Sequence, residues 1–264
     1  MSIDLAQTPA TGQESLAHLE RETLRFVEVA ERSPLAAHVP AYPAFTVETL
    51  SVHIGRALRI FGAVVAGASE PEGAGGDAPS GPAVVGWVKE GLSPLLGVLR
   101  EVRPDTLVPF PHGVGNRPAS LVAPSLAVEV GVHRWDLESV LGDHAPIPSD
   151  LAIEEIDRVF ESFVPRLAGA DVAPIGGTVE LRATDVAVSW AISVHDGHLD
   201  AARRTSRTVE PDVVVAASAE DLALVVWKRS PPPRPGVEVT GRVDVLKRFL
   251  AVDYIPDPRT TPAH

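Results

Sequence analysis

The hydrophobic pattern of the 264-residue chain changes period once, and this change restricts the possible folds more than any other feature. Up to about residue 167 the apolar residues recur every three to four positions, which is the spacing of one face of an α-helix. From Thr178 onward they alternate with polar residues, as in a half-buried β-strand. The sequence therefore predicts a two-domain α+β protein, with a helical domain over 1–170 and a small α+β domain over 171–264.

Five helices are expected in the first part, joined by loops rich in proline and glycine. Thr46 has the side chain of an N-cap, and Pro124 suits the first turn of a helix. Pro94 is expected to kink or split the helix that contains it. Four prolines predict a loop over 104–118. Short connections between amphipathic helices favour an antiparallel bundle. The expected helices cover 13–31, 47–66, 83–102, 124–141 and 149–167.

Strands and helices are mixed in the second part. Runs with period two or of continuous apolar character predict the strands, and longer runs with a 3.6-residue period predict the helices. The expected strands cover 178–182, 186–194, 213–216 and 236–240, and the expected helices cover 219–229 and 243–250.

Composition excludes several classes of function. The net charge of −12 disfavours nucleic acid and anionic membranes as partners. No run approaches the ~20 apolar residues of a membrane span, and the first residues lack a signal-peptide pattern, so we expect a cytoplasmic protein. The sequence contains no cysteine. Any metal must therefore be bound by His, Asp or Glu, and any thiol chemistry requires a thiol from a small molecule.

Three residues on two expected helices have the pattern of a metal site. Glu129 and His133 are four positions apart, so they lie about 40° apart around the helix axis and about 6 Å along it. His53 stands among apolar residues of its helix and is expected to point into the bundle. Two histidines and one carboxylate leave coordination positions open, as a catalytic Zn²⁺ requires. The alternative is an exposed Glu-His pair and a satisfied core histidine.

Two neighbouring residues have more than one interpretation. Asp136 follows His133 by three positions and either orients its imidazole by a hydrogen bond or, as the favoured interpretation, pairs with an arginine on the helix surface. His112 lies in the loop before the fourth long helix and either overhangs the site or is solvated. The remaining histidines are expected to be solvated: His18, His38, His144, His195, His198 and His264.

Several segments resemble the mycothiol-dependent maleylpyruvate isomerase family. YPAFTVETLSVHIG resembles the family's Trp-Thr-Val-x-x-Leu-x-x-His-Leu-Gly segment, and EVGVHRWDLESVLG resembles its Glu-Thr-x-Val-His-Arg-Trp-Asp helix. The segments DLALVVWKR and VTGRVDVLKRFL resemble later landmarks and follow in the same order. The resemblance covers about residues 14–252.

The resemblance implies a DinB-like four-helix bundle joined to a sterol-carrier-protein-like α+β domain. It implies a divalent metal, usually zinc, bound by His53, Glu129 and His133. Arg229 matches an arginine of the family's Trp-Gly-Arg element, which implies that it binds an acidic substrate. The residues alone also allow Arg229 to complement the dipole at the end of its helix. Lys228 replaces the glycine of that element, and SLAVE replaces Arg-Met-Ala-His-Glu beside the metal helix, which leaves the particular substrate open.

These implications together predict a metal-dependent enzyme that uses mycothiol. It would either isomerise a small, acidic, electrophilic substrate or transfer the thiol to it. It would have neither nucleic acid nor membrane as a partner. Two other classes remain open. One is a binding protein that encloses a small apolar ligand and keeps a metal only for its structure. The other is a zinc-dependent hydrolase, for which the sequence does not identify a general base.

Overall fold

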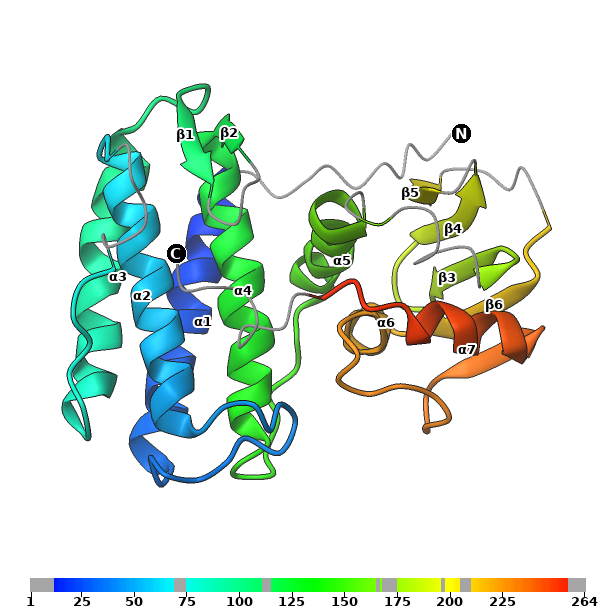
Figure 1. The fold of residues 1–264 in the computed structure, drawn as a ribbon, viewed down its shortest axis with the longest axis horizontal. Coiled ribbons are helices and arrows are strands. Elements are labelled where there is room, and N and C mark those ends of the chain that lie inside the picture. Colours follow the sequence, from blue (N-terminus) through cyan, green and yellow to red (C-terminus); the bar gives the residue numbers. More distant parts are fainter. Residues whose placement is uncertain are drawn as a thin grey trace. The chain divides into compact units, whose positions relative to one another are not determined.

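The computed structural model describes residues 12–68, 75–110, 115–164, 167, 175–195, 198–204 and 210–255, and it divides into two compact units. The bundle unit extends from helix α1 to Ala145, and the sheet unit extends from Pro146 to helix α7 (Figure 1). A helical region followed by a sheet-containing region confirms the α+β two-domain class. The units part at Ala145 and Pro146, earlier than the boundary expected near residue 170.

Helix α5 (Ser149–Arg158) accounts for this difference, because it packs against helix α6 (Ala219–Val226) of the sheet unit. Just before α5, the N–H of Ile147 donates to the carboxylate of Glu220 on α6. The sequence pattern shows that α5 is amphipathic, but it does not show which domain covers the apolar face.

Helices α1 to α4 form the bundle unit (Figure 1). Helix α1 packs against α3 and α4, and helix α2 packs against the same two neighbours. Thr46 caps α2 as predicted, because its hydroxyl accepts the N–H of Thr49. Pro94 lies inside α3, which continues across it. Among the described residues, no helix is both long and apolar enough to cross a membrane. The bounds are Gly12–Arg32 for α1, Val47–Val65 for α2, Ala83–Glu101 for α3 and Val122–Glu138 for α4.

A two-stranded ribbon precedes α4, where the sequence analysis expected only a loop. Strand β1 (Leu107–Phe110) pairs antiparallel with strand β2 (Gly115–Pro118), so the prediction of a loop over 104–118 is wrong in this part. The prolines misled the prediction, because proline lacks the N–H that a strand donates to its partner. In a ribbon of two strands each strand has one unpaired edge, and proline is tolerated there. A 3₁₀ turn, Ala119–Leu121, leads into α4.

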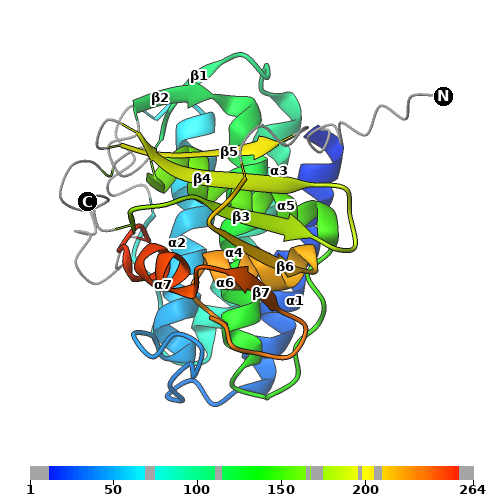
Figure 2. The ribbon, with the colours of Figure 1, turned by 90° about the vertical axis from the view of Figure 1, so that its right-hand side faces the viewer.

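A mixed five-stranded sheet forms the sheet unit, in the order β5-β4-β3-β6-β7 (Figure 2). Strands β3 and β6 are parallel, and the other pairs are antiparallel. The strands are β3 Val179–Ala183, β4 Ser189–His195, β5 His198–Arg204, β6 Val213–Ala217 and β7 Glu238–Gly241, and the last helix, α7, covers Val243–Ala251.

Two elements of the sheet unit differ from expectation. Strand β5 was not predicted, because its sequence HLDAARR is mostly polar. It lies at the edge of the sheet and is specified by its backbone pairing with β4 rather than by an apolar pattern. Helix α5 was expected to reach residue 167, but its α-helical part ends at Arg158 and a π-helical turn continues over Val159–Phe163.

Helices α2 and α3 approach each other closely at Gly55. A Cβ atom at this position would lie 2.3 Å from Cζ3 of the Trp87 ring. The guanidinium of Arg59 lies 3.9 Å from the centroid of a Trp87 ring and donates to the backbone oxygen of Trp87. Because the ring is held in this way, only glycine allows the observed helix separation, and His53 is two residues away on the same helix.

We therefore expect Gly55→Ala to destabilise the protein by about 1–3 kcal/mol, because the added methyl group overpacks the contact with Trp87. Gly86→Ala is the matched control, because Gly86 is exposed within α3 and a Cβ there meets nothing within 4 Å. We expect this control to stabilise the helix by about 0.5–1 kcal/mol. Urea unfolding measures both variants. Equal stability of the two would contradict the close approach.

Candidate metal centre

Three donor atoms converge between helices α2 and α4 of the bundle unit. His53 comes from α2, and Glu129 and His133 come from α4. Nε2 of His53 lies 2.8 Å from Oε1 of Glu129, and Nε2 of His133 lies 3.4 Å from the same oxygen. One donor atom from each residue lies within 4.8 Å of the other two. The structure thus brings together the three residues that the sequence analysis selected.

The three side chains differ in exposure. The side chains of His53 and Glu129 are each 32% exposed, whereas that of His133 is 10% exposed. A small molecule can therefore reach the group from the side of His53 and Glu129, while His133 forms its inner wall.

The charges of neighbouring side chains affect the pKa values of Glu129 and His133 in this group. Burial alone raises the pKa of Glu129, but hydrogen bonds with His133 and His53 outweigh it and hold that pKa well below its usual range. Burial lowers the pKa of His133, but hydrogen bonds with Asp136 and Glu129 outweigh it and raise the pKa to about 9. The carboxylate is thus ionised and matched by positive charge. A divalent ion bound here would displace the second proton of the His133 imidazole, because a histidine ligand is neutral.

Asp136 holds the inner histidine. Its carboxylate is fully buried, and Oδ2 lies 3.0 Å from Nδ1 of His133. The favoured interpretation, a pair on the helix surface, is therefore wrong, and the hydrogen bond that the alternative interpretation requires is present. With Nδ1–H donated to Asp136, the ring presents Nε2 to Glu129 and to any ion. The sequence analysis misjudged Asp136 because it assumed a solvated outer face on α4.

Two aromatic rings from the loop between α1 and α2 cover the histidines. The Phe45 ring centroid lies 5.5 Å from that of His53 and 5.8 Å from that of His133. Tyr42 stacks on His133 with a centroid distance of 6.2 Å. The N–H of Ala41 donates to the hydroxyl of Ser139 just after α4, which ties the loop to that helix. The sequence analysis did not select Tyr42, because a residue in an irregular loop carries no periodic signal.

The remaining histidines divide into three groups. His18 was expected to be solvated, and this prediction is wrong, because its side chain is buried in α1 against Arg21. His38, His144 and His198 are exposed as predicted. His112 and His264, like the side chain of His195, lie outside the described residues.

Arg229 belongs to the sheet unit. It follows helix α6, where Lys228 adopts a left-handed backbone conformation with a φ of 59°. The N–H of Arg229 donates to the carbonyl of Leu224, and its Nη1 donates to the carbonyl of Trp227. The half-buried Arg229 thus stands at the carboxyl end of the helix, where a cation complements the helix dipole.

The arrangement defines a class of protein, a helical bundle carrying a His₂Glu group joined to an α+β domain. The model of the mycothiol maleylpyruvate isomerase N-terminal domain matches residues 16–138, and the model of the MDMPI C-terminal domain matches residues 150–248. The chain belongs to the mycothiol-dependent maleylpyruvate isomerase family, which is a family of enzymes.

Solved structures share the fold of this chain. A histidine-to-alanine mutant of the mycothiol-dependent maleylpyruvate isomerase is 15% identical, with a TM-score of 0.63 over 88% of this chain and 93% of that one. A second structure of the mycothiol-dependent maleylpyruvate isomerase is also 15% identical over the same shares, with a TM-score of 0.59. At this identity the likeness shows a shared fold. No curated protein matches the chain significantly.

We expect Asp136→Asn to weaken zinc binding about 10- to 100-fold, because the neutral amide is a poorer acceptor for the N–H of His133. Competition with a chelating dye measures the affinity. Asp105→Asn is the matched control, because Asp105 is exposed beside Arg103. Wild-type zinc affinity in the Asp136 variant would contradict an orienting role for this carboxylate.

Proposed function

We propose that the chain is a metal-dependent enzyme that uses mycothiol as an isomerase or S-transferase, acting on a small, acidic, electrophilic substrate. The observation that carries the proposal is the convergence of His53, Glu129 and His133 within 4.8 Å. Two imidazoles and one carboxylate on a partly exposed face suit a divalent ion that keeps positions for other ligands. Membership of the family supports the use of mycothiol.

The donor set fits a resident zinc ion. Imidazole nitrogen and carboxylate oxygen are both ordinary zinc ligands, and a structural zinc site is usually closed by a fourth protein ligand. Among the described residues, the group contains three such donors. Asp136 accepts the hydrogen bond at Nδ1 of His133, as the partner of a metal-bound histidine usually does. We therefore propose that His53, Glu129 and His133 bind zinc and leave room for a thiol.

The chemistry of the site follows from its charges. A bound divalent ion lowers the pKa of a coordinated thiol and so supplies a thiolate near neutral pH. The sequence contains no cysteine, so this thiol has to come from a small molecule. A thiolate adds to an activated carbon–carbon double bond and leaves a single bond that rotates. The addition leaves a carbanion, which either expels the thiolate and restores the double bond in the other geometry or takes up a proton and leaves a thioether.

The chain's own residues bind and orient the reactants. Arg229 would bind a carboxylate of the substrate through its planar guanidinium. Phe45 and Tyr42 cover the histidine rings and limit the access of water from that side. Asp136 holds His133 in the tautomer that offers Nε2. These roles require a substrate that is both anionic and electrophilic.

Metal content tests the proposed site. We expect the wild-type protein, purified without added metal, to contain about one zinc ion per chain, because three donors already converge. His133→Ala should lose this zinc, while His144→Ala should keep it, because His144 is exposed and stacks on Trp135. Elemental analysis with a protein assay gives the ratio. A wild-type protein without zinc, and without affinity for added zinc, would contradict the proposed mechanism.

Arg229 is tested through substrate binding. We expect Arg229→Met to raise the KM for an acidic substrate such as maleylpyruvate by roughly 10-fold or more, because the charged hydrogen bonds to a carboxylate are lost. Zinc content should not change. Lys247→Met is the control, because Lys247 is an exposed cation of the same unit. An unchanged KM in an active Arg229 variant would exclude this residue from substrate recognition.

A further inference from the structure

Helix α4 has buried residues on every side, so apolar packing does not determine its rotation about its own axis. Thirteen of its seventeen residues are buried, and these include every residue of the consecutive run Val130–Arg134. A helix with one apolar face turns that face toward the core, but a helix with buried apolar residues all round has no single face to turn inward. Some other interaction has to turn Glu129 and His133 toward His53.

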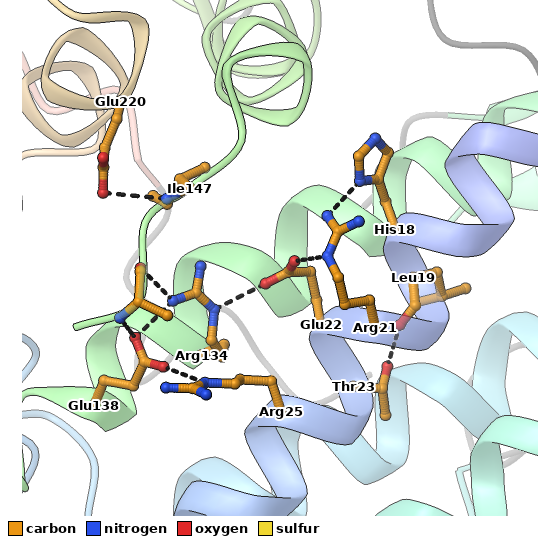
Figure 3. A network of polar contacts seen from close by, with 11 residues as sticks. His18, Leu19, Arg21, Glu22, Thr23, Arg25, Arg134, Glu138, Ile147 and Glu220 are labelled. Atoms are coloured by element: carbon orange, nitrogen blue, oxygen red, sulfur yellow. Dashed lines mark hydrogen bonds and ion pairs between the residues drawn. The ribbon is translucent and has the colours of Figure 1, made fainter. Parts of the chain in front are cut away.

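A buried ion network supplies a directional contact on α4 (Figure 3). Arg134, adjacent to His133, has a side chain that is 1% exposed. Its Nε donates to Oε2 of Glu22 on α1 at 2.8 Å. Its Nη1 donates to Oε2 of Glu138 at 2.6 Å and to the carbonyl of Ala145 at 2.9 Å. The planar guanidinium is thus held by α1, by its own helix and by the chain beyond it.

Each buried carboxylate is also held at its second oxygen. Oε1 of Glu22 accepts from Arg21, and Oε1 of Glu138 accepts from Arg25, both on α1 (Figure 3). The N–H of Ala145 donates to Glu138 as well. Buried carboxylates with both oxygens bonded resist displacement, because every lost contact leaves a charge without a partner. The network therefore fixes α4 against α1 in a single orientation.

We propose that Arg134 is a positioning residue of the metal centre, which acts by fixing the rotation of helix α4. This inference rests on the proposed metal site. A rotation of α4 by about 20° would move a donor atom about 6 Å from the helix axis by about 2 Å, which is the length of a zinc–ligand bond. The contact of Arg134 with α1 prevents this rotation, so the two ligands of α4 meet His53.

The network is better suited to setting an orientation than to adding stability. Moving three or more charges out of water costs desolvation free energy, and the attraction between the charges often does no more than offset this cost. Apolar replacement of a whole network is therefore often neutral or stabilising for the fold. Replacement of Arg134, Glu22 and Glu138 together by apolar residues should therefore retain a folded bundle that has lost its rotational restraint.

Cobalt substitution tests the proposal on the full-length protein. Co²⁺ replaces zinc in such sites, and its visible absorption reports the coordination geometry independently of activity. The variants are Arg134→Met, Arg134→Lys and the triple variant Arg134→Met, Glu22→Met, Glu138→Met. Arg32→Met is the matched control, because Arg32 is an exposed arginine at the end of α1, paired with Glu28. Circular dichroism and thermal unfolding of the metal-free proteins report folding.

We expect the folded Arg134 variants and the triple variant to bind Co²⁺ about 10- to 100-fold more weakly than wild type, with an altered absorption band. Arg32→Met should have the wild-type affinity and band. A folded Arg134 variant with wild-type affinity and band overturns the proposal. Failure of all three variants to fold also overturns it, because Arg134 would then serve stability alone. A wild-type protein that binds no Co²⁺ contradicts the metal site itself.

Discussion

The burial of ionisable side chains on helix α4 is the constraint on which the proposed metal centre depends. Arg134, Asp136 and Glu138 are each at most 1% exposed, and a buried charge is tolerated only where a partner matches it. Arg134 lies between two glutamates, and Asp136 faces His133. The pairs Arg134–Glu138 and Asp136–His133 lie within α4 and turn with it, so the rotation of α4 is restricted by the contacts of Arg134 and Glu138 with Glu22 and Arg25 of α1. The proposed positioning of Glu129 and His133 opposite His53 rests on these contacts with α1.

The sequence predicted the parts of the fold that periodicity specifies. The four bundle helices were expected within a few residues of their observed bounds, because each covers several turns of one repeating pattern. Strand β5 and the β1–β2 ribbon were missed, because a polar edge strand and a proline-containing ribbon are specified by backbone pairing with a distant segment. Helix α5 was predicted correctly as a helix, but the domain to which it belongs depends on its packing partner.

The candidate site was predictable in its residue pattern but not in its surroundings. The spacing of Glu129 and His133 placed them on one face of a helix, the apolar neighbours of His53 placed it toward the bundle interior, and the resemblance implied the same three residues. Asp136 was judged by the usual behaviour of acidic residues on helix surfaces, and it is buried instead. Arg134 was not selected, because arginine is abundant in this sequence and no local pattern distinguishes a buried arginine. The residues that position the site are therefore harder to find than the donors themselves.

The backbone at Lys228 shows how a substitution at a glycine position is accommodated. A left-handed conformation costs a residue with a side chain about 1–2 kcal/mol. The lysine ammonium donates to the carbonyl of Val252 and lies 4.6 Å from the centroid of the Tyr254 ring, so its side chain joins the end of α6 to the segment after α7. Since Arg229 follows directly, these contacts help to fix the backbone from which the proposed substrate-binding guanidinium extends. The contacts of the Lys228 side chain thus hold a left-handed backbone conformation that a residue other than glycine rarely adopts.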